Sequence, residues 1–205
     1  LKLAGFSMLL TILFGVGFGI LMAVRKDRLL DHVLGTFSTA ALSVPGFWIA
    51  IVLIFLFAEQ WKLLPSSGIS GGSGFILPAV TLALPSIGVC ARLTRSAILD
   101  EIGRQYMTVA DAKGMSRRHA VVCHAFGNAL IPIITYLGNH MAGIIGGASI
   151  VETIFAIPGI GSYAIAGVQS KDYYVVQAYV LFSGCIYVLT NILIDLIYIA
   201  LDPKI

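Results

Sequence analysis

Three side chains that could bind a ligand stand together in a charge-free stretch of the sequence, at residues 125–151: Asn139, His140 and Met141. A neutral imidazole beside a thioether suits a soft divalent cation. The alternative is that His140 makes a hydrogen bond between two helices. We therefore treat His140 as a weak metal candidate, predict no firm metal site and expect no cofactor.

Asn191 and Asp195 form a second polar group, four residues apart and so on one face of a helix. A charge at the centre of a bilayer costs at least ~2.5 kcal/mol, so Asp195 needs a reason to be there. It could line a path for solute or protons. We favour a structural ion pair with Arg92 or Arg95 instead.

Glu152 precedes a segment interrupted by Pro158 and Gly159. Irregular backbone at membrane depth must face protein or a water-filled cavity, so this segment could form a gate or the mouth of a pore. Glu152 could equally be an ordinary carboxylate at a helix end. Gly146 and Gly147 nearby would allow close helix approach or keep a pore wide.

The amino-acid composition indicates the class of protein in which these residues lie. Only 11% of the 205 residues are charged and 58% are hydrophobic, with net charge +3. A soluble domain carries about 25% charged residues, and disordered chains need still more charge. Both classes are excluded, and an integral membrane protein is predicted.

Charge-free runs predict five membrane-spanning helices, at about 3–24, 33–58, 75–99, 125–151 and 173–200. The predicted fold is an all-α transmembrane helix bundle forming one domain, 1–205. Of the 13 Lys and Arg residues, all but Lys2, Lys62 and Lys171 fall on one side of these spans. The positive-inside rule makes that side cytoplasmic, which places the first residue outside and the last inside.

Residues 100–124 form a long charged segment between the third and fourth predicted spans. Its apolar positions predict two short amphipathic helices, with Ser116 as an N-cap for the second. They could lie in the lipid interface. We favour a docking surface for a soluble partner, because joining two spans needs only a few residues.

The chain here resembles ABC-importer permeases of type I, and within them the dipeptide, oligopeptide and nickel group. The resemblance rests on these runs, with weaker similarity before Ala91: Ala110-Asp111-Ala112-Lys113-Gly114-Met115-Ser116, His124-Ala125, Asn128-Ala129-Leu130-Ile131-Pro132, Glu152-Thr153-Ile154-Phe155, Pro158-Gly159-Ile160-Gly161 and Leu201-Asp202-Pro203-Lys204.

In this family, an E-A-A-x-x-x-G pattern forms a helix that inserts into a cytoplasmic ATPase subunit. Counting back from Gly114 puts Thr108 where the family has its glutamate. We therefore expect coupling by shape, not by an ion pair at that position. The implied coupling residues are Thr108, Val109, Ala110, Ala112, Lys113, Gly114 and Met115.

The resemblance also implies partners and place. We expect cytoplasmic ATPase subunits, a second and unlike permease, an extracytoplasmic solute-binding protein and the lipid of a bacterial or archaeal plasma membrane, and no nucleic acid. The substrate would be a peptide or nickel. Because the family has one more amino-terminal span and an external segment, we expect both to be missing from this sequence.

Other functions are less well supported by the sequence. A stand-alone secondary transporter or channel remains the alternative, although no internal repeat is evident. No H-E-x-x-H occurs, which argues against an intramembrane metalloprotease, and no P-loop occurs. Gly15, Gly17 and Gly19 lie in an apolar span, so close helix packing is predicted for them.

Overall fold

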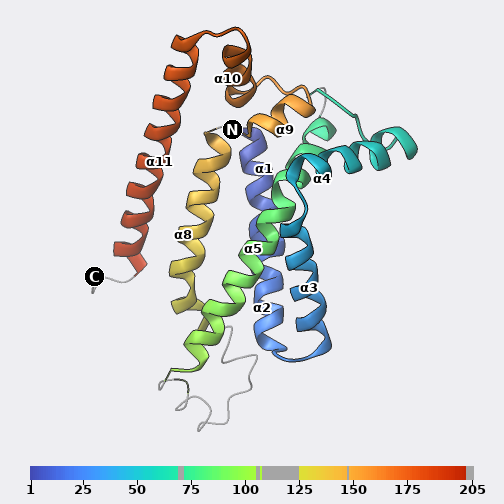
Figure 1. The fold of residues 1–205 in the computed structure, drawn as a ribbon. Coiled ribbons are helices and arrows are strands. Elements are labelled where there is room, and N and C mark those ends of the chain that lie inside the picture. The colour runs from blue at the N-terminus through green and yellow to red at the C-terminus, as the bar shows by residue number, and fades with distance from the viewer. Residues whose placement is uncertain (69–71, 105–106, 108–124, 147, 202–205) are drawn as a thin grey trace. The chain divides into compact units, whose positions relative to one another are not determined.

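The computed structural model describes residues 1–68, 72–104, 107, 125–146 and 148–201. All regular secondary structure in these residues is helical, without a strand (Figure 1). The elements in chain order are α1 (Lys2–Leu10), η1 (Thr11–Val16), α2 (Gly17–Val24), α3 (Leu29–Ser43), α4 (Gly46–Leu53), η2 (Ile54–Gln60), η3 (Gly72–Phe75), α5 (Ile76–Ile102), α8 (Phe126–Ile145), α9 (Ser149–Ile154), α10 (Ile160–Gln169) and α11 (Tyr173–Leu201).

Among the described residues, three helical runs are long and apolar enough to cross a membrane: Lys2–Val24, Gly72–Ile102 and Tyr173–Ile199. They match the first, third and fifth predicted spans. The second corresponds to α3 and the α4–η2 run, which pass the same test only when taken together and are bent by 100° at the break between them. The count of five spans therefore stays a prediction.

The fourth predicted span, 125–151, is interrupted. Its helix α8 ends at Ile145, and α9 begins at Ser149. Two asparagines and a histidine lower the hydropathy of α8, which is not among the runs that pass the spanning test alone. The fourth span therefore stays a prediction.

Proline explains the break in the second span. Pro45 has ψ 138° and caps α4, so α3 ends two residues earlier, at Ser43. The ring of Pro45 disfavours helical geometry at the residue before it and removes a backbone donor. Pro85, by contrast, lies inside α5, which continues past it to Ile102.

The chain forms two compact units. The α3 unit comprises Leu10–Ser43 and Leu84–Leu137. Its helices α2 and α3 lie side by side, joined by a short turn (Figure 1). Gly15 and Gly19 face α5: a Cβ on Gly15 would stand 2.7 Å from Cys90 Cβ, and one on Gly19 would overlap Thr94. Close packing is thus confirmed for these two glycines, whereas Gly17 faces open space.

The α11 unit comprises Leu1–Leu9, Val44–Ala83 and Gly138–Ile205. Gly138 packs against Ile194 of α11, and Ser183 Oγ donates a hydrogen bond of 3.2 Å to Gly146 O. Asp172 caps α11 by accepting from the backbone N–H groups of Tyr174 and Val175, at 3.1 and 3.3 Å. Small residues therefore let α8 approach α11 closely, and a carboxylate begins α11.

Candidate functional site

The seven predicted coupling residues, 108–110 and 112–115, lie outside the described residues, and so does Gly147. The last turn of α5 is the nearest described helical turn before them in the chain. There the N–H groups of Gly103 and Arg104 bond to the carbonyls of Leu99 and Glu101, and Arg104 Nε lies 2.9 Å from Glu101 Oε1. The coupling role therefore stays a prediction.

Seven residues before the end of α5, Arg95 makes a two-bond ion pair with Asp31 of α3. Its Nε donates to Asp31 Oδ1 at 2.7 Å, and its NH2 nitrogen donates to Oδ2 at 2.8 Å. The Asp31 side chain is 5% exposed and that of Arg95 is 29% exposed. Such forked, charge-assisted pairs are stronger than neutral hydrogen bonds and are specific to arginine.

Asp31 also holds the turn that precedes its own helix. Its Oδ2 accepts the backbone N–H of Asp27 at 2.9 Å, and Asp27 has the uncommon φ of 61°. A carboxylate in the first turn of α3 is further favoured by the positive end of the helix dipole. One buried carboxylate thus joins the turn between α2 and α3 to the C-terminal part of α5.

Arg95 is bonded to Asp31, and the ion pair of Asp195 with Arg92 or Arg95 stays a prediction. Asp195 is exposed on α11. The sequence argument considered acids inside the spans and left out Asp31, which lies just before one.

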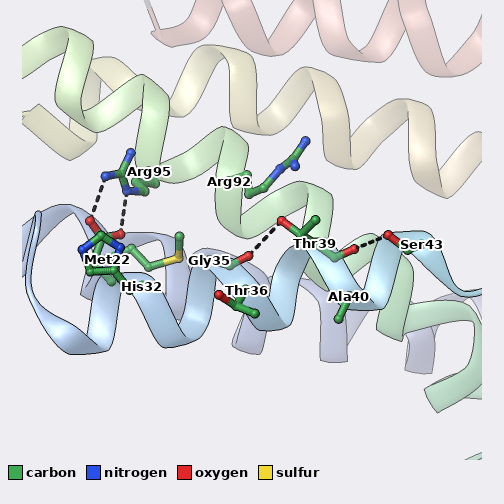
Figure 2. A pocket seen from close by; sticks show the side chains of 10 residues that line it. Met22, His32, Gly35, Thr36, Thr39, Ala40, Ser43, Arg92 and Arg95 are labelled. Atoms are coloured by element: carbon green, nitrogen blue, oxygen red, sulfur yellow. Dashed lines mark hydrogen bonds and ion pairs between the residues drawn. The ribbon is translucent and has the colours of Figure 1, made fainter.

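A pocket of about 700 Å³ lies beside this ion pair in the α3 unit. Figure 2 shows Arg92 and Arg95 of α5 on one side of it, and polar residues of α3 on the other. Those polar residues are His32, Thr36, Thr39 and Ser43, and all four are exposed. Sequence analysis missed them, although their spacing of four, three and four residues is a helical period.

In the α11 unit, the carboxylate of Glu152 caps α10. Its Oε2 accepts the backbone N–H of Ser162 at 2.8 Å, and only 8% of Glu152 is exposed. Ser162 Oγ in turn accepts the N–H of Gly159 at 3.0 Å. The negative charge sits at the positive end of the helix dipole, where it is stabilising.

Gly159 is required by this arrangement, since a Cβ there would overlap the Glu152 carboxylate. Glu152 and Pro158 also border a second pocket, of about 540 Å³, which lies between α9 and α10. The described geometry thus gives Glu152 a structural partner. A role of Glu152, Pro158 and Gly159 in a gate stays a prediction.

The three candidate ligands of α8 differ in exposure. Asn139 is exposed, His140 is partly buried and Met141 is 39% exposed. Among the described residues, no three His, Cys, Asp or Glu side chains cluster closely enough to hold a metal ion. The pore roles of Asn139, His140 and Gly146 stay predictions.

Comparison with known proteins shows which family this chain is similar to. A family model described as "Binding-protein-dependent transport system inner membrane component" matches residues 15–205. The probable peptide ABC transporter permease protein y4tP of Sinorhizobium fredii is 39% identical, over 100% of this chain and 68% of its own length. The probable D,D-dipeptide transport system permease protein DdpB of Escherichia coli is 35% identical, over 100% and 69%.

The glutathione transport system permease protein GsiC of Escherichia coli is 34% identical, over 97% of this chain and 65% of its own. Among solved structures, an inward-facing MetNI methionine ABC transporter matches with a TM-score of 0.78. That match has 15% identity and covers 98% of this chain and 92% of the other. At this identity it shows a shared fold.

Proposed function

The chain belongs to the family of binding-protein-dependent transport system inner membrane components and is a permease subunit of an ABC importer; from that premise we propose that it forms part of the path by which peptides cross the membrane. The observation that carries the substrate class is that relatives named for peptide, D,D-dipeptide and glutathione transport match 97–100% of the chain. Nickel, which the sequence resemblance also suggested, is the competing substrate.

Uptake assays separate these substrates. A strain lacking the gene should lose uptake of a labelled dipeptide and regain it with the full-length gene, while ⁶³Ni uptake stays unchanged. Loss of nickel uptake alone would assign the chain to metal import. Restored uptake driven by an ion gradient, without any ATPase subunit, would support the stand-alone transporter instead.

The segment 105–122 is proposed to be the lever that a cytoplasmic ATPase moves. What supports it is the resemblance of Ala110 to Ser116 to the family's coupling loop, together with the family membership. A helix seated in the ATPase surface must follow the ATPase subunits when they move as rigid bodies. ATP hydrolysis then belongs to the partner and transport to this chain.

Gly114 allows a matched test of the lever. Gly114→Trp should abolish copurification of the ATPase subunit and reduce peptide uptake to background. Gly127→Trp is the control, because Gly127 is exposed at the start of α8 and a Cβ there meets nothing within 4 Å. Undiminished ATPase binding in Gly114→Trp would exclude this segment as the docking site.

The remaining partners follow from the same premise. We place a solute-binding protein on the outer face and a second permease, different from this one, beside it. The chain begins outside and ends in the cytoplasm of a bacterial or archaeal cell, as the distribution of basic residues indicates. Copurification from cells that express all subunits, followed by mass spectrometry, would identify the second permease or find this chain paired with itself.

A further inference from the structure

One face of α3 is polar along almost its whole length. His32, Thr36, Thr39 and Ser43 are exposed and line the pocket of about 700 Å³. The first and the last of them are 11 positions apart, which is about 16 Å at roughly 1.5 Å per residue. Polar groups at membrane depth are found facing protein, water or solute, because contact with lipid tails leaves them without hydrogen bonds. This exposed face of α3 therefore favours a polar occupant over lipid.

The charges around the pocket indicate what the occupant carries. Arg95 and Asp31 neutralise each other in their ion pair. Arg92, one helical turn earlier on α5, makes no ion pair or hydrogen bond within the described part of the chain, and it is exposed on the pocket side (Figure 2). An unpaired guanidinium at a pocket wall favours an anionic oxygen ligand, above all a carboxylate.

The hydroxyl groups of α3 have a defined polarity. Thr39 Oγ1 donates to Gly35 O at 3.0 Å, and Ser43 Oγ donates to Thr39 O at 2.9 Å (Figure 2). The hydroxyl hydrogens of Thr39 and Ser43 are therefore used inside the helix, and their oxygen lone pairs are left to accept from a ligand. A row of acceptors suits the N–H groups of a peptide backbone, whereas an acyl chain would need an apolar wall.

We propose that this pocket binds a short peptide in transit, with Arg92 on its C-terminal carboxylate and the α3 hydroxyls accepting its N–H groups. This inference rests on the proposed function and names the site where the substrate lies. An extended peptide spans about 3.5 Å per residue, so 16 Å of polar face accommodates up to roughly four residues. Arg92 then selects peptides with a free C-terminus.

Cysteine protection tests the pocket without the solute-binding protein. The reporter is Thr36→Cys in the assembled full-length transporter, with Cys123 and Cys185 replaced by Ser; Cys90 is kept because it is fully buried. A water-soluble maleimide should label the reporter, and Ala-Ala should slow labelling. Ala-Ala amide, which lacks the carboxylate, should need about tenfold higher concentration for the same protection.

Three variants of the reporter protein test whether Arg92 causes the difference in protection between Ala-Ala and its amide. Arg92→Gln should make Ala-Ala as weak as its amide, and Arg92→Lys should retain part of the difference because it keeps the charge. Arg25→Gln, which removes an exposed arginine outside the pocket, should behave as the parent. Ala-Ala uptake in proteoliposomes with the solute-binding protein should fall about tenfold in Arg92→Gln.

Two results would overturn the proposal. One is equal protection by Ala-Ala and its amide, or protection unaffected by Arg92→Gln. The other is labelling that depends on the phosphatidylglycerol content of the vesicles and not on peptide, which would make the anion a lipid phosphate. If Ala-Ala uptake is intact while either result is found, only this pocket is excluded; if the parent transports no peptide at all, the proposed function itself fails.

Discussion

Arg95 and Asp31 join α5 to α3 through two parallel hydrogen bonds of 2.7 and 2.8 Å, and the same carboxylate holds the backbone of Asp27. The pair is important because α5 leads toward the proposed coupling segment. A movement of that segment would pass to α3 through a contact that is directional as well as attractive.

Removing either partner should weaken the α3 unit. Arg95→Ala leaves the Asp31 carboxylate buried without its cation, at a cost of about 2 kcal/mol. Arg95→Lys should lose about half as much, since one ammonium cannot form both bonds. Apparent melting temperatures of the purified full-length protein measure both, with Arg25→Ala as the exposed control.

The double exchange Asp31→Arg with Arg95→Asp tests whether the attraction between the two charges stabilises the protein, apart from which position carries which charge. It should recover part of the stability lost in either single change, because the charges again attract. A double variant as unstable as the sum of the singles would show that the pair contributes no mutual attraction.

The glycines of the first helical run offer a second test. Gly19→Leu should be destabilising by about 1–3 kcal/mol, because its Cβ would overlap Thr94 on α5. Gly17→Leu should be neutral or slightly stabilising, since Gly17 faces open space and leucine is the better helix former. Expression level and melting temperature check both. Equal effects at the two positions would contradict the packing described for α5.

The capping of α10 by Glu152 predicts a coupled pair of changes. Glu152→Ala should cost about 1 kcal/mol through the lost bond to Ser162 N–H, and Glu152→Gln less, because it keeps an acceptor oxygen. Gly159→Ala should be destabilising in the parent, where its methyl overlaps the carboxylate. In the Glu152→Ala background the carboxylate is absent, so Gly159→Ala should be less destabilising there.

Protease resistance of residues 155–172 and melting temperature measure this coupling. Gly127→Ala provides the control for the loss of a glycine in a helix, because no atom crowds that position. The capping model requires that the two changes together cost less than the sum of each alone. Additive costs would exclude the contact.

The orientation in the membrane can be tested with two cysteines. Ser170→Cys lies in the exposed turn between α10 and α11, and Arg25→Cys lies in the exposed turn after α2. A maleimide that does not cross membranes should label Ser170→Cys in intact cells, and Arg25→Cys only after permeabilisation. The opposite pattern would reverse the proposed topology.

Sequence patterns predicted the class of fold well because hydropathy acts locally. Runs without charge are readily identified as apolar helices, and three of the five predicted spans correspond to helical runs that pass the spanning test. Breaks were harder to predict: Pro45 interrupts its span, whereas Pro85 does not interrupt α5. The effect of a proline depends on whether neighbouring groups satisfy the backbone it frees, which is a property of packing.

The sequence by itself determined that the chain is a helical membrane protein, and its motifs indicated the family, since composition and spacing are properties of the chain alone. Only the tertiary structure decided which charges meet. Asp31 and Arg95 are 64 residues apart, and no local pattern relates them. Ion pairs and pockets depend on which helix faces which, and that is set by packing details such as Gly15 and Gly19 against α5. The polar face of α3 likewise forms a pocket only because the fold places Arg92 of α5 beside it.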